Sequence, residues 1–599
     1  MENKHLTDQN PDKWMVSWSR QLVEHAQIAL AQPEQAMTYI QELLMATTRG
    51  ESCIALDLAG RQSLAQLLLD ENTITSNLQQ QIAPLVCDDQ SVYLYRYWAL
   101  EFSLSQHVYR IQQHAMPVID LSPFQDLLQD QQQRQALQMV ATQALSVITG
   151  GPGTGKTYTL ARIIAVLNHA QSDLRIAMAA PTGKAAQRMK EALQNSFADP
   201  KLEHLLNAKL KQQDTLTLHR LLGLGHHRQP RYHAQHPLPY DVVVVDEASM
   251  IDLQMATYLC AAIAAGSRLI LLGDAQQLAS VDVGAVLADL QQVDALQANR
   301  VHLLTSRRFN AYSPIGQMAR FIQKYATSEL SPSQRLKLFE QEVITATEFA
   351  LPDLSGDQAQ ADQMCLSYLP TQLTTADLQQ NLQILSSGYA AYFKALDEYA
   401  LQYRVADDPD ALERAIQTVL HAFDGYRILT AIHFGHLGLN ALNQAVEAAL
   451  LQQLTHVVQQ GEWYLGRPVM MSYNDDQLGL SNGDIGICFY HRSQTNQFEV
   501  YFPALDYWVA ATRLPKSIHT AFAMTIHKSQ GSEFQHVAVV LDAAAQRLLS
   551  QELLYTAITR AKTALSLLVH PESLVQSLAV KTSRKSGLVE KLESAFRSI

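Results

Sequence analysis

Eight consecutive residues in the first third of the chain form a phosphate-binding pattern. Gly150-Gly151-Pro152-Gly153-Thr154-Gly155-Lys156-Thr157 matches G-x-x-x-x-G-K-[ST] and lies between an apolar run and a helical stretch. Glycines let backbone N–H groups turn toward phosphate oxygens, and the following helix adds its positive end. We expect Lys156 to reach the β- and γ-phosphates of ATP and Thr157 to hold Mg²⁺.

Two acidic residues and a glutamine follow further apolar runs. Val242 to Val245 lead directly into Asp246 and Glu247, and Leu271-Leu272 precede Gly273-Asp274 and Gln277. A buried strand that ends in two carboxylates supplies the second half of an ATP site. We expect Asp246 to bind Mg²⁺ and Glu247 to orient or deprotonate the attacking water. Gln277 is a weak signal alone, but after these motifs it indicates a side chain that senses the γ-phosphate.

Two arginines on other segments are candidates for completing the site. Arg308 lies in Ser306-Arg307-Arg308-Phe309, and Arg560 ends the segment 555–560. An arginine that reaches the γ-phosphate can accelerate its transfer by roughly 10³- to 10⁵-fold.

Repeated strand, loop and helix patterns must position these residues. Short apolar runs that end in motif loops and alternate with helical stretches indicate a buried parallel sheet. The runs of the first unit are 146–149, 175–178, 242–245 and 269–272. Those of a second unit are 427–432, 521–526, 536–541 and 564–569. The predicted fold class is therefore α/β, with two parallel sheets.

Composition divides the chain into four parts. Residues 1–120 read as helical, with an aromatic run at 93–98 that favours a packing face over the alternative of a partner-docking face. Residues 121–345 form the first ATPase domain, and the Gln- and Asp-rich residues 346–425 form a helical connecting region. Residues 426–599 form the second α/β domain, and its insertion at 462–518 reads as a small β-barrel.

Charge and cysteine content limit the class of protein. The net charge is −12, whereas proteins that coat DNA are usually basic, so we expect any DNA contact to be confined to a channel or shared with partner chains. Five widely spaced cysteines favour free buried thiols. No apolar run of eighteen residues and no signal-peptide pattern occur, so we expect a cytoplasmic protein without a membrane span.

The order of the motifs resembles that of the superfamily-one DNA helicases over residues 133–562. The matching segments are 133–136, the phosphate loop, 180–186, 245–252, Gly273-Asp274 with Gln277, 526–534 and 555–562. Within that superfamily the chain is similar to the RecD family, the alpha subunits of exonuclease V. The narrower likeness comes from the segments 231–238, 466–469, 474–475 and 482–486, together with the length of the chain.

The resemblance implies two RecA-like domains and roles for further residues. Gln133 reads the adenine edge, since a carboxamide can pair with both an acceptor and a donor there. Gly531 lies beside the nucleotide, Glu533 contacts the ribose, and Arg560 completes the γ-phosphate region that Gln277 and Arg308 contact from the first domain. The residues that line the DNA track are Thr182, Gly183, Lys184, His219, Thr525 and His527.

Three positions depart from the family pattern. Tyr158 stands where Thr is usual, Ala279 where Pro is usual, and Arg307 where Tyr is usual. None of them removes a catalytic side chain, but the last leaves open whether Arg307 or Arg308 reaches the γ-phosphate.

The resemblance also implies a function and partners. Members are ATP-dependent 5′-to-3′ DNA helicases that act with a beta chain (helicase and nuclease) and a gamma chain on double-strand-break ends, for recombinational repair and degradation of linear DNA. The family places residues 1–120 against the gamma chain and gives the 462–518 insertion an SH3-like fold. A stand-alone 5′-to-3′ helicase and a regulatory ATPase subunit that controls a partner nuclease are the alternatives. Because acids do not cluster outside the ATP site, we expect nuclease activity in another chain.

Overall fold

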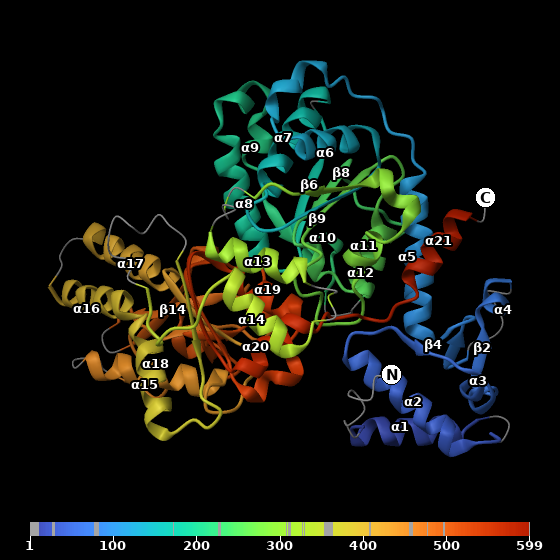
Figure 1. Ribbon diagram of the computed structural model, residues 1–599. Helices are drawn as coiled ribbons and strands as arrows, with labels where there is room; N and C mark the ends of the chain where they lie inside the picture. Colours follow the sequence, from blue (N-terminus) through green and yellow to red (C-terminus); the bar gives the residue numbers. More distant parts are fainter. Residues whose placement is uncertain are drawn as a thin grey trace.

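Four sheets organise the chain in the computed structural model (Figure 1). The structure describes all residues except 1–10, 27–29, 77–82, 172, 226–228, 307, 309–312, 326–327, 329, 353–362, 406–408, 455–458, 476, 495–496 and 598–599. Two of the sheets are parallel and carry the predicted motifs, so the α/β fold class is confirmed.

The N-terminal segment contains a small sheet, which corrects the prediction that residues 1–120 are helical. Its strands, in the order β1-β4-β3-β2, are β1 (Cys53–Ala55), β4 (Ser91–Leu94), β3 (Leu85–Cys87) and β2 (Leu68–Asp70). Its helices are α1 (Lys13–Glu24), α2 (Pro33–Thr48), α3 (Leu58–Leu64), α4 (Glu71–Ser76) and α5 (Tyr95–Gln112). Strands of three or four residues are too short to show the alternation by which a strand is recognised in sequence. Figure 1 shows this segment as a separate lobe, from which α5 runs to the first unit.

The first unit is a six-stranded parallel sheet in the order β10-β5-β9-β8-β6-β7. Its central strands, β5 (Leu145–Gly150), β9 (Arg268–Gly273), β8 (Val242–Val245) and β6 (Ile176–Ala180), are the four predicted runs. The edge strands β10 (Arg300–Leu303) and β7 (Thr215–Thr217) were not among the predicted runs. Its helices are α6 (Gln131–Thr142), α7 (Lys156–Ala170), α8 (Gly183–Phe197), α9 (Ala208–Lys211), α10 (Leu218–Leu222), α11 (Leu253–Ala262) and α12 (Val286–Leu290). Because β5, β9 and β8 are neighbours, their motif loops meet at one sheet edge.

The second unit is a five-stranded parallel sheet in the order β11-β20-β19-β12-β18. Four of its strands match the predicted runs: β20 (Ala561–Val569), β19 (Phe534–Leu541), β12 (Tyr426–Thr430) and β18 (Ala523–Thr525). The edge strand β11 (Gln363–Tyr368) lies in the predicted helical connecting region, which corrects that prediction. Only Leu366 and Ser367 of β11 are buried, so its half-polar sequence lacks the continuous apolar run of a central strand.

Two helices that precede the predicted domain boundary at residue 345 belong to the second unit. The structure places α13 (Pro314–Lys324) and α14 (Pro332–Glu342) with the second unit, where Ile315, Met318 and Phe339 join the core around β19 and β20. The predicted boundary is wrong here because composition changes only near residue 345, whereas the chain passes to the second unit after β10.

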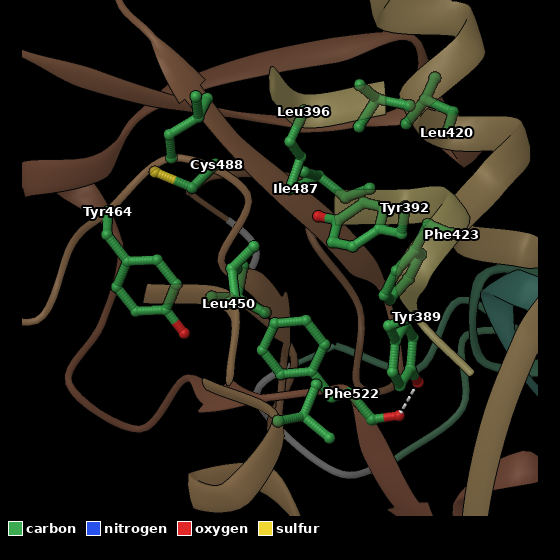
Figure 2. Close-up of a cluster of buried hydrophobic side chains, with 14 of the residues drawn as sticks. Tyr389, Tyr392, Leu396, Leu420, Phe423, Leu450, Tyr464, Ile487, Cys488 and Phe522 are labelled. Carbon is green, nitrogen blue, oxygen red and sulfur yellow. Dashed lines mark hydrogen bonds between the residues drawn. The ribbon is translucent and has the colours of Figure 1, made fainter. Parts of the chain in front are cut away.

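The connecting helices pack against the insertion. They are α15 (Thr375–Ser387), α16 (Ala390–Val405) and α17 (Pro409–Asp424), and α18 (Leu439–Gln453) follows β12. The insertion is an antiparallel sheet in the order β16-β15-β14-β13-β17, formed by β16 (Tyr507–Ala510), β15 (Phe498–Phe502), β14 (Ile485–Tyr490), β13 (Pro468–Met470) and β17 (His519–Thr520). Figure 2 shows Tyr389 and Tyr392 in their shared core, where the Tyr389 hydroxyl donates to the Phe522 carbonyl and that of Tyr392 to the Gly466 carbonyl at 2.7 Å.

The end of the chain returns to the first unit. Helices α19 (Gln551–Ile558) and α20 (Pro571–Ala579) belong to the second unit, but α21 (Leu588–Arg597) packs along α5 and adds Leu588 and Leu592 to the first unit's core (Figure 1). Between α20 and α21, the Arg584 guanidinium donates to the carbonyls of Ser280 at 2.6 Å and Gly284 at 2.9 Å. The C-terminal segment, residues 580–597, therefore ties both units to α5.

A buried polar cluster fixes this segment. Glu101 on α5 accepts a hydrogen bond from Lys591 Nζ at 3.1 Å, and the Ser586 hydroxyl lies 3.1 Å from Glu101 and 3.2 Å from Asp289. Burial, and then the neighbouring Glu101, raise the pKa of Asp289 to about 7. Asp289 therefore holds a proton in the folded chain at pH values where an exposed carboxyl is ionised.

Asp289→Asn is expected to remove a pH dependence of stability. The folded state keeps the proton up to about pH 7 and the unfolded chain releases it near pH 4, so the wild-type chain loses stability as pH rises through this window. The Asn side chain does not ionise, so the variant gains about 1–3 kcal/mol over the wild type between pH 5 and pH 8. Urea unfolding at both pH values measures this gain. Asp294→Asn, at an exposed position, is the control, and an Asp289→Asn difference that is equal at both pH values would contradict the prediction.

Candidate nucleotide site and DNA track

The phosphate-binding loop joins β5 to α7. Gly153 and Gly155 adopt φ angles of 74° and 80°, which glycine reaches without steric cost. A Cβ at Gly153 would lie 2.3 Å from the Cβ of Arg308, so the glycine also allows the Arg308 segment to approach closely. Lys156 and Thr157 open α7, and Lys156 Nζ donates to two carbonyls at the start of the loop, at 2.6 and 3.2 Å. The amine thus lies inside the loop.

Gln133 offers an unsatisfied acceptor beside this loop. It lies in the first turn of α6, which Asp130 caps, and its side chain is buried. Its Nε2 lies 3.5 Å from the Thr154 carbonyl, whereas its buried Oε1 has no hydrogen-bond partner. A buried orphan acceptor is costly, and a ligand that brings an N–H donor would satisfy it. The position therefore fits the edge of an adenine base.

Asp246 and Glu247 follow β8, at the same edge of the sheet as the phosphate-binding loop. Burial, and then the neighbouring Glu247, raise the pKa of Asp246 to about 6, although Lys156 opposes the shift. Asp246 Oδ1 accepts the Glu247 N–H at 2.8 Å. Glu247 has φ 52°, a left-handed conformation that costs a non-glycine residue on the order of 1 kcal/mol or more. A buried carboxyl group whose charge is destabilised by burial and by a neighbouring carboxylate fits a site for a divalent cation.

The two units meet through Gln277 and Arg560. Arg560 is buried, and its guanidinium donates to Gln277 Oε1 at 2.9 Å and to the carbonyls of Ser532 and Thr556, both at 3.1 Å. Gln277 Nε2 donates in turn to Asp274 at 3.1 Å. Residues that lie 283 positions apart in sequence are therefore in direct contact at the edge of the first sheet.

Glu533 is shared by two arginines. Arg308 donates to both of its carboxylate oxygens, at 2.7 and 2.6 Å, and Arg188 Nη2 lies 2.6 Å from Oε2. Burial alone raises the pKa of Glu533, but the two guanidinium groups more than offset it and lower the pKa to about 2. Arg188 is a site residue that the sequence motifs miss. Its only signal in the sequence is its place four residues after Lys184, on the same face of a helix.

Five of the six predicted DNA residues lie at the ends of two strands, one in each unit. Thr182 caps α8 after β6, accepting the Ala185 N–H at 3.2 Å, and Lys184 Nζ lies 5.4 Å from the centre of the Phe534 ring. Burial, and then Arg427, lower the pKa of Lys184 to about 7. In the second unit Thr525 ends β18, and His527 follows, with a pKa that burial lowers.

A turn of the insertion lies against both of these segments. A Cβ at Gly183 would lie 3.4 Å from Asp484 Oδ1, and Lys528 Nζ donates to Asn482 Oδ1 at 2.5 Å. The turn 481–484 thus contacts the loop after β6 and the loop after β18. His219 follows β7 and lines a cavity of about 640 Å³, whose described lining includes Ser481 of this turn but neither Thr525 nor His527.

The cysteines are free thiols, as predicted. Cys53, Cys87, Cys260 and Cys488 are buried free thiols, and Cys365 is half-buried. Across the described ranges, no group of three or more His, Cys, Asp and Glu side chains is arranged to hold a metal ion. No described helix combines the length and apolar character needed to cross a membrane. Arg307 lies outside the described residues.

The chain matches known families and relatives along most of its length. Residues 133–283 match the AAA domain, and residues 520–568 match the UvrD-like helicase C-terminal domain. The RecBCD enzyme subunit RecD of Haemophilus influenzae is 33% identical, over 87% of this chain and 83% of the relative. That of Mycobacterium tuberculosis is 35% identical, over 85% and 81%. The ATP-dependent RecD2 DNA helicase of Deinococcus radiodurans is 28% identical, over 72% of this chain and 48% of the relative.

Proposed function

The chain belongs to the RecD family of DNA helicase subunits, and on this premise we propose that it moves 5′ to 3′ along a single strand of DNA at the expense of ATP. The polarity rests on membership of the family, and the observation that carries an ATP-driven movement is the contact between Arg560 and Gln277. It joins an arginine of one unit to the residue that we assign as the γ-phosphate sensor in the other, so ATP in the phosphate loop would change how the units are held together.

Each residue of the site has a role in this proposal. Gln133 accepts from the adenine, the loop 150–157 cradles the phosphates, and Thr157 and Asp246 hold Mg²⁺, which neutralises phosphate charge when it is bound with ATP. Glu247 orients or deprotonates the attacking water. The remaining assigned residues surround the nucleotide: Gln277, Arg308, Gly531, Glu533 and Arg560.

Movement along DNA requires DNA-binding residues on both units, and we call each set a DNA grip. Thr182, Gly183 and Lys184 belong to the first unit, and Thr525 and His527 to the second, so a change in spacing between the units moves one grip relative to the other. Backbone contacts permit stepping on any sequence, because phosphate spacing does not depend on the bases. Opening one base-pair step costs about 0.6–2.2 kcal/mol.

We further propose that the chain works in a RecBCD assembly on double-strand-break ends. The N-terminal lobe is the docking part for the gamma chain, and the beta chain supplies nuclease activity. Supporting this, the lobe has its own core and exposes Trp14 and Leu58, which are 52% and 80% accessible. Burial of these two side chains against a partner chain would remove apolar surface from water.

Unwinding of two duplexes by the purified chain tests the proposal. One duplex carries a 5′ single-stranded overhang and the other a 3′ overhang, each with ATP and Mg²⁺. We expect unwinding from the 5′ overhang, and none by a Lys156→Gln control. Unwinding only from the 3′ overhang would overturn the polarity. DNA-stimulated ATP hydrolysis without unwinding, both alone and with the partner chains, would support a regulatory ATPase instead.

A further inference from the structure

Helix α8 reaches from the DNA track to the nucleotide site. Thr182 caps its first turn, Lys184 lies in that turn, and one turn later Arg188 lies beside Glu533 of the second unit. An α-helix rises about 1.5 Å per residue, so Lys184 and Arg188 are only about 6 Å apart along one rigid element. A force applied at Arg188 therefore acts directly on the residues assigned to grip DNA.

The segment 531–534 of the second unit lies along this helix. Gly531 has φ 68°, and a Cβ there would lie 3.2 Å from the Cβ of Ala185. Phe534 lies under the Lys184 ammonium, and Glu533 pairs with Arg188. Three contacts therefore join one short segment to two turns of α8. Of the three, the Glu533 contact is the ion pair.

Glu533 also connects Arg188 to the phosphate loop. Its second partner, Arg308, approaches the loop at Gly153, so a γ-phosphate bound there would compete with Glu533 for the Arg308 guanidinium. Arg188 is then the partner that keeps Glu533 against α8. Glu533 is 14% exposed and Arg188 33%, so the pair is screened less than a surface ion pair.

We propose that Arg188 is a positioning residue that transmits the occupancy of the nucleotide site to the DNA grip of the first unit through its ion pair with Glu533. The inference rests on the proposed function. It assigns to Arg188 a coupling role distinct from binding phosphate or DNA. A guanidinium is suited to it, because its planar fork holds a carboxylate in one orientation.

Lys190 provides a matched control on the same helix. Its side chain is also 33% exposed and also forms an ion pair, with Asp214 at 2.7 Å, but that pair lies within the first unit. Comparing Arg188→Met with Lys190→Met in the full chain therefore separates loss of an inter-unit pair from loss of a pair on α8. Arg188→Lys keeps the positive charge but loses the planar guanidinium, so it tests whether that planar group is needed.

Two ratios measure the coupling. The first is the Kd for single-stranded DNA with a non-hydrolysable ATP analogue divided by the Kd without it. The second is the ATP hydrolysis rate with single-stranded DNA divided by the rate without it. We expect Arg188→Met to bring both ratios about 10-fold closer to one, Arg188→Lys to do so in part, and Lys190→Met to leave them within twofold of the wild type.

The outcomes separate this inference from the proposed function. Ratios for Arg188→Met that equal those of Lys190→Met would overturn the coupling role while leaving the helicase in place. Equal losses of hydrolysis with and without DNA would also overturn it, because Arg188 would then act on phosphate chemistry. A wild-type chain whose ATP hydrolysis does not respond to DNA would overturn the proposed function, and this inference with it.

Discussion

Lys156→Gln is expected to reduce ATP hydrolysis by about 10²- to 10³-fold and to abolish unwinding. The Lys156 ammonium is the cation inside the phosphate loop, and its hydrogen-bond partners are two loop carbonyls. Glutamine keeps much of the length but removes the charge that would meet the β- and γ-phosphates, and removing one such donor costs a reaction about that factor. Phosphate release in the presence of single-stranded DNA measures the loss.

Stability is not expected to fall in this variant. Lys156 forms no ion pair among the described contacts, and the loop conformation depends on its glycines. Thermal unfolding of the variant is therefore expected to match that of the wild type, and Lys201→Gln, at an exposed position, serves as the charge control. DNA-stimulated hydrolysis within about fivefold of the wild type would contradict the assignment of this loop.

The central strands and the loop between β5 and α7 were predictable because each strand combines a buried apolar run with a motif at its end. Val242 to Val245, for example, form a short apolar run typical of a buried strand, and the acidic residues directly after it must lie at a sheet edge. The strand order was not predicted, and the structure supplies it: β9 pairs with both β5 and β8, which brings Asp246 to the same sheet edge as the phosphate loop.

Contacts between distant segments were not predictable in the same way. The pairing of Arg188 with Glu533 depends on how two separate units dock, and neither periodicity nor a motif encodes that geometry. The same reason applies to α13, whose amphipathic pattern predicts a helix but not the sheet on which its apolar face packs. In the N-terminal segment, strands such as β1 are too short to carry a signal at all.

Arg560→Lys is expected to lower the maximal rate of ATP hydrolysis by about 10²- to 10³-fold while changing the KM for ATP much less. The Arg560 guanidinium contacts Gln277, Ser532 and Thr556 in three directions at once, which a lysine ammonium on a flexible stem does not reproduce. An arginine that stabilises charge in phosphoryl transfer contributes about 10³- to 10⁵-fold, and retained charge recovers part of this. Steady-state kinetics with saturating single-stranded DNA give both parameters.

The contact with Gln277 makes a second variant informative. If Arg560 and Gln277 act as one unit across the interface, then Gln277→Ala reduces the rate too, and the double variant is about as slow as Arg560→Lys alone, because interacting residues are not additive. Arg547→Lys, exposed on the same unit, controls for the substitution itself, and thermal unfolding establishes that each variant is folded. Losses that multiply in the double variant would show that the two residues act independently, and an Arg560→Lys rate within threefold of the wild type would exclude Arg560 from the γ-phosphate site.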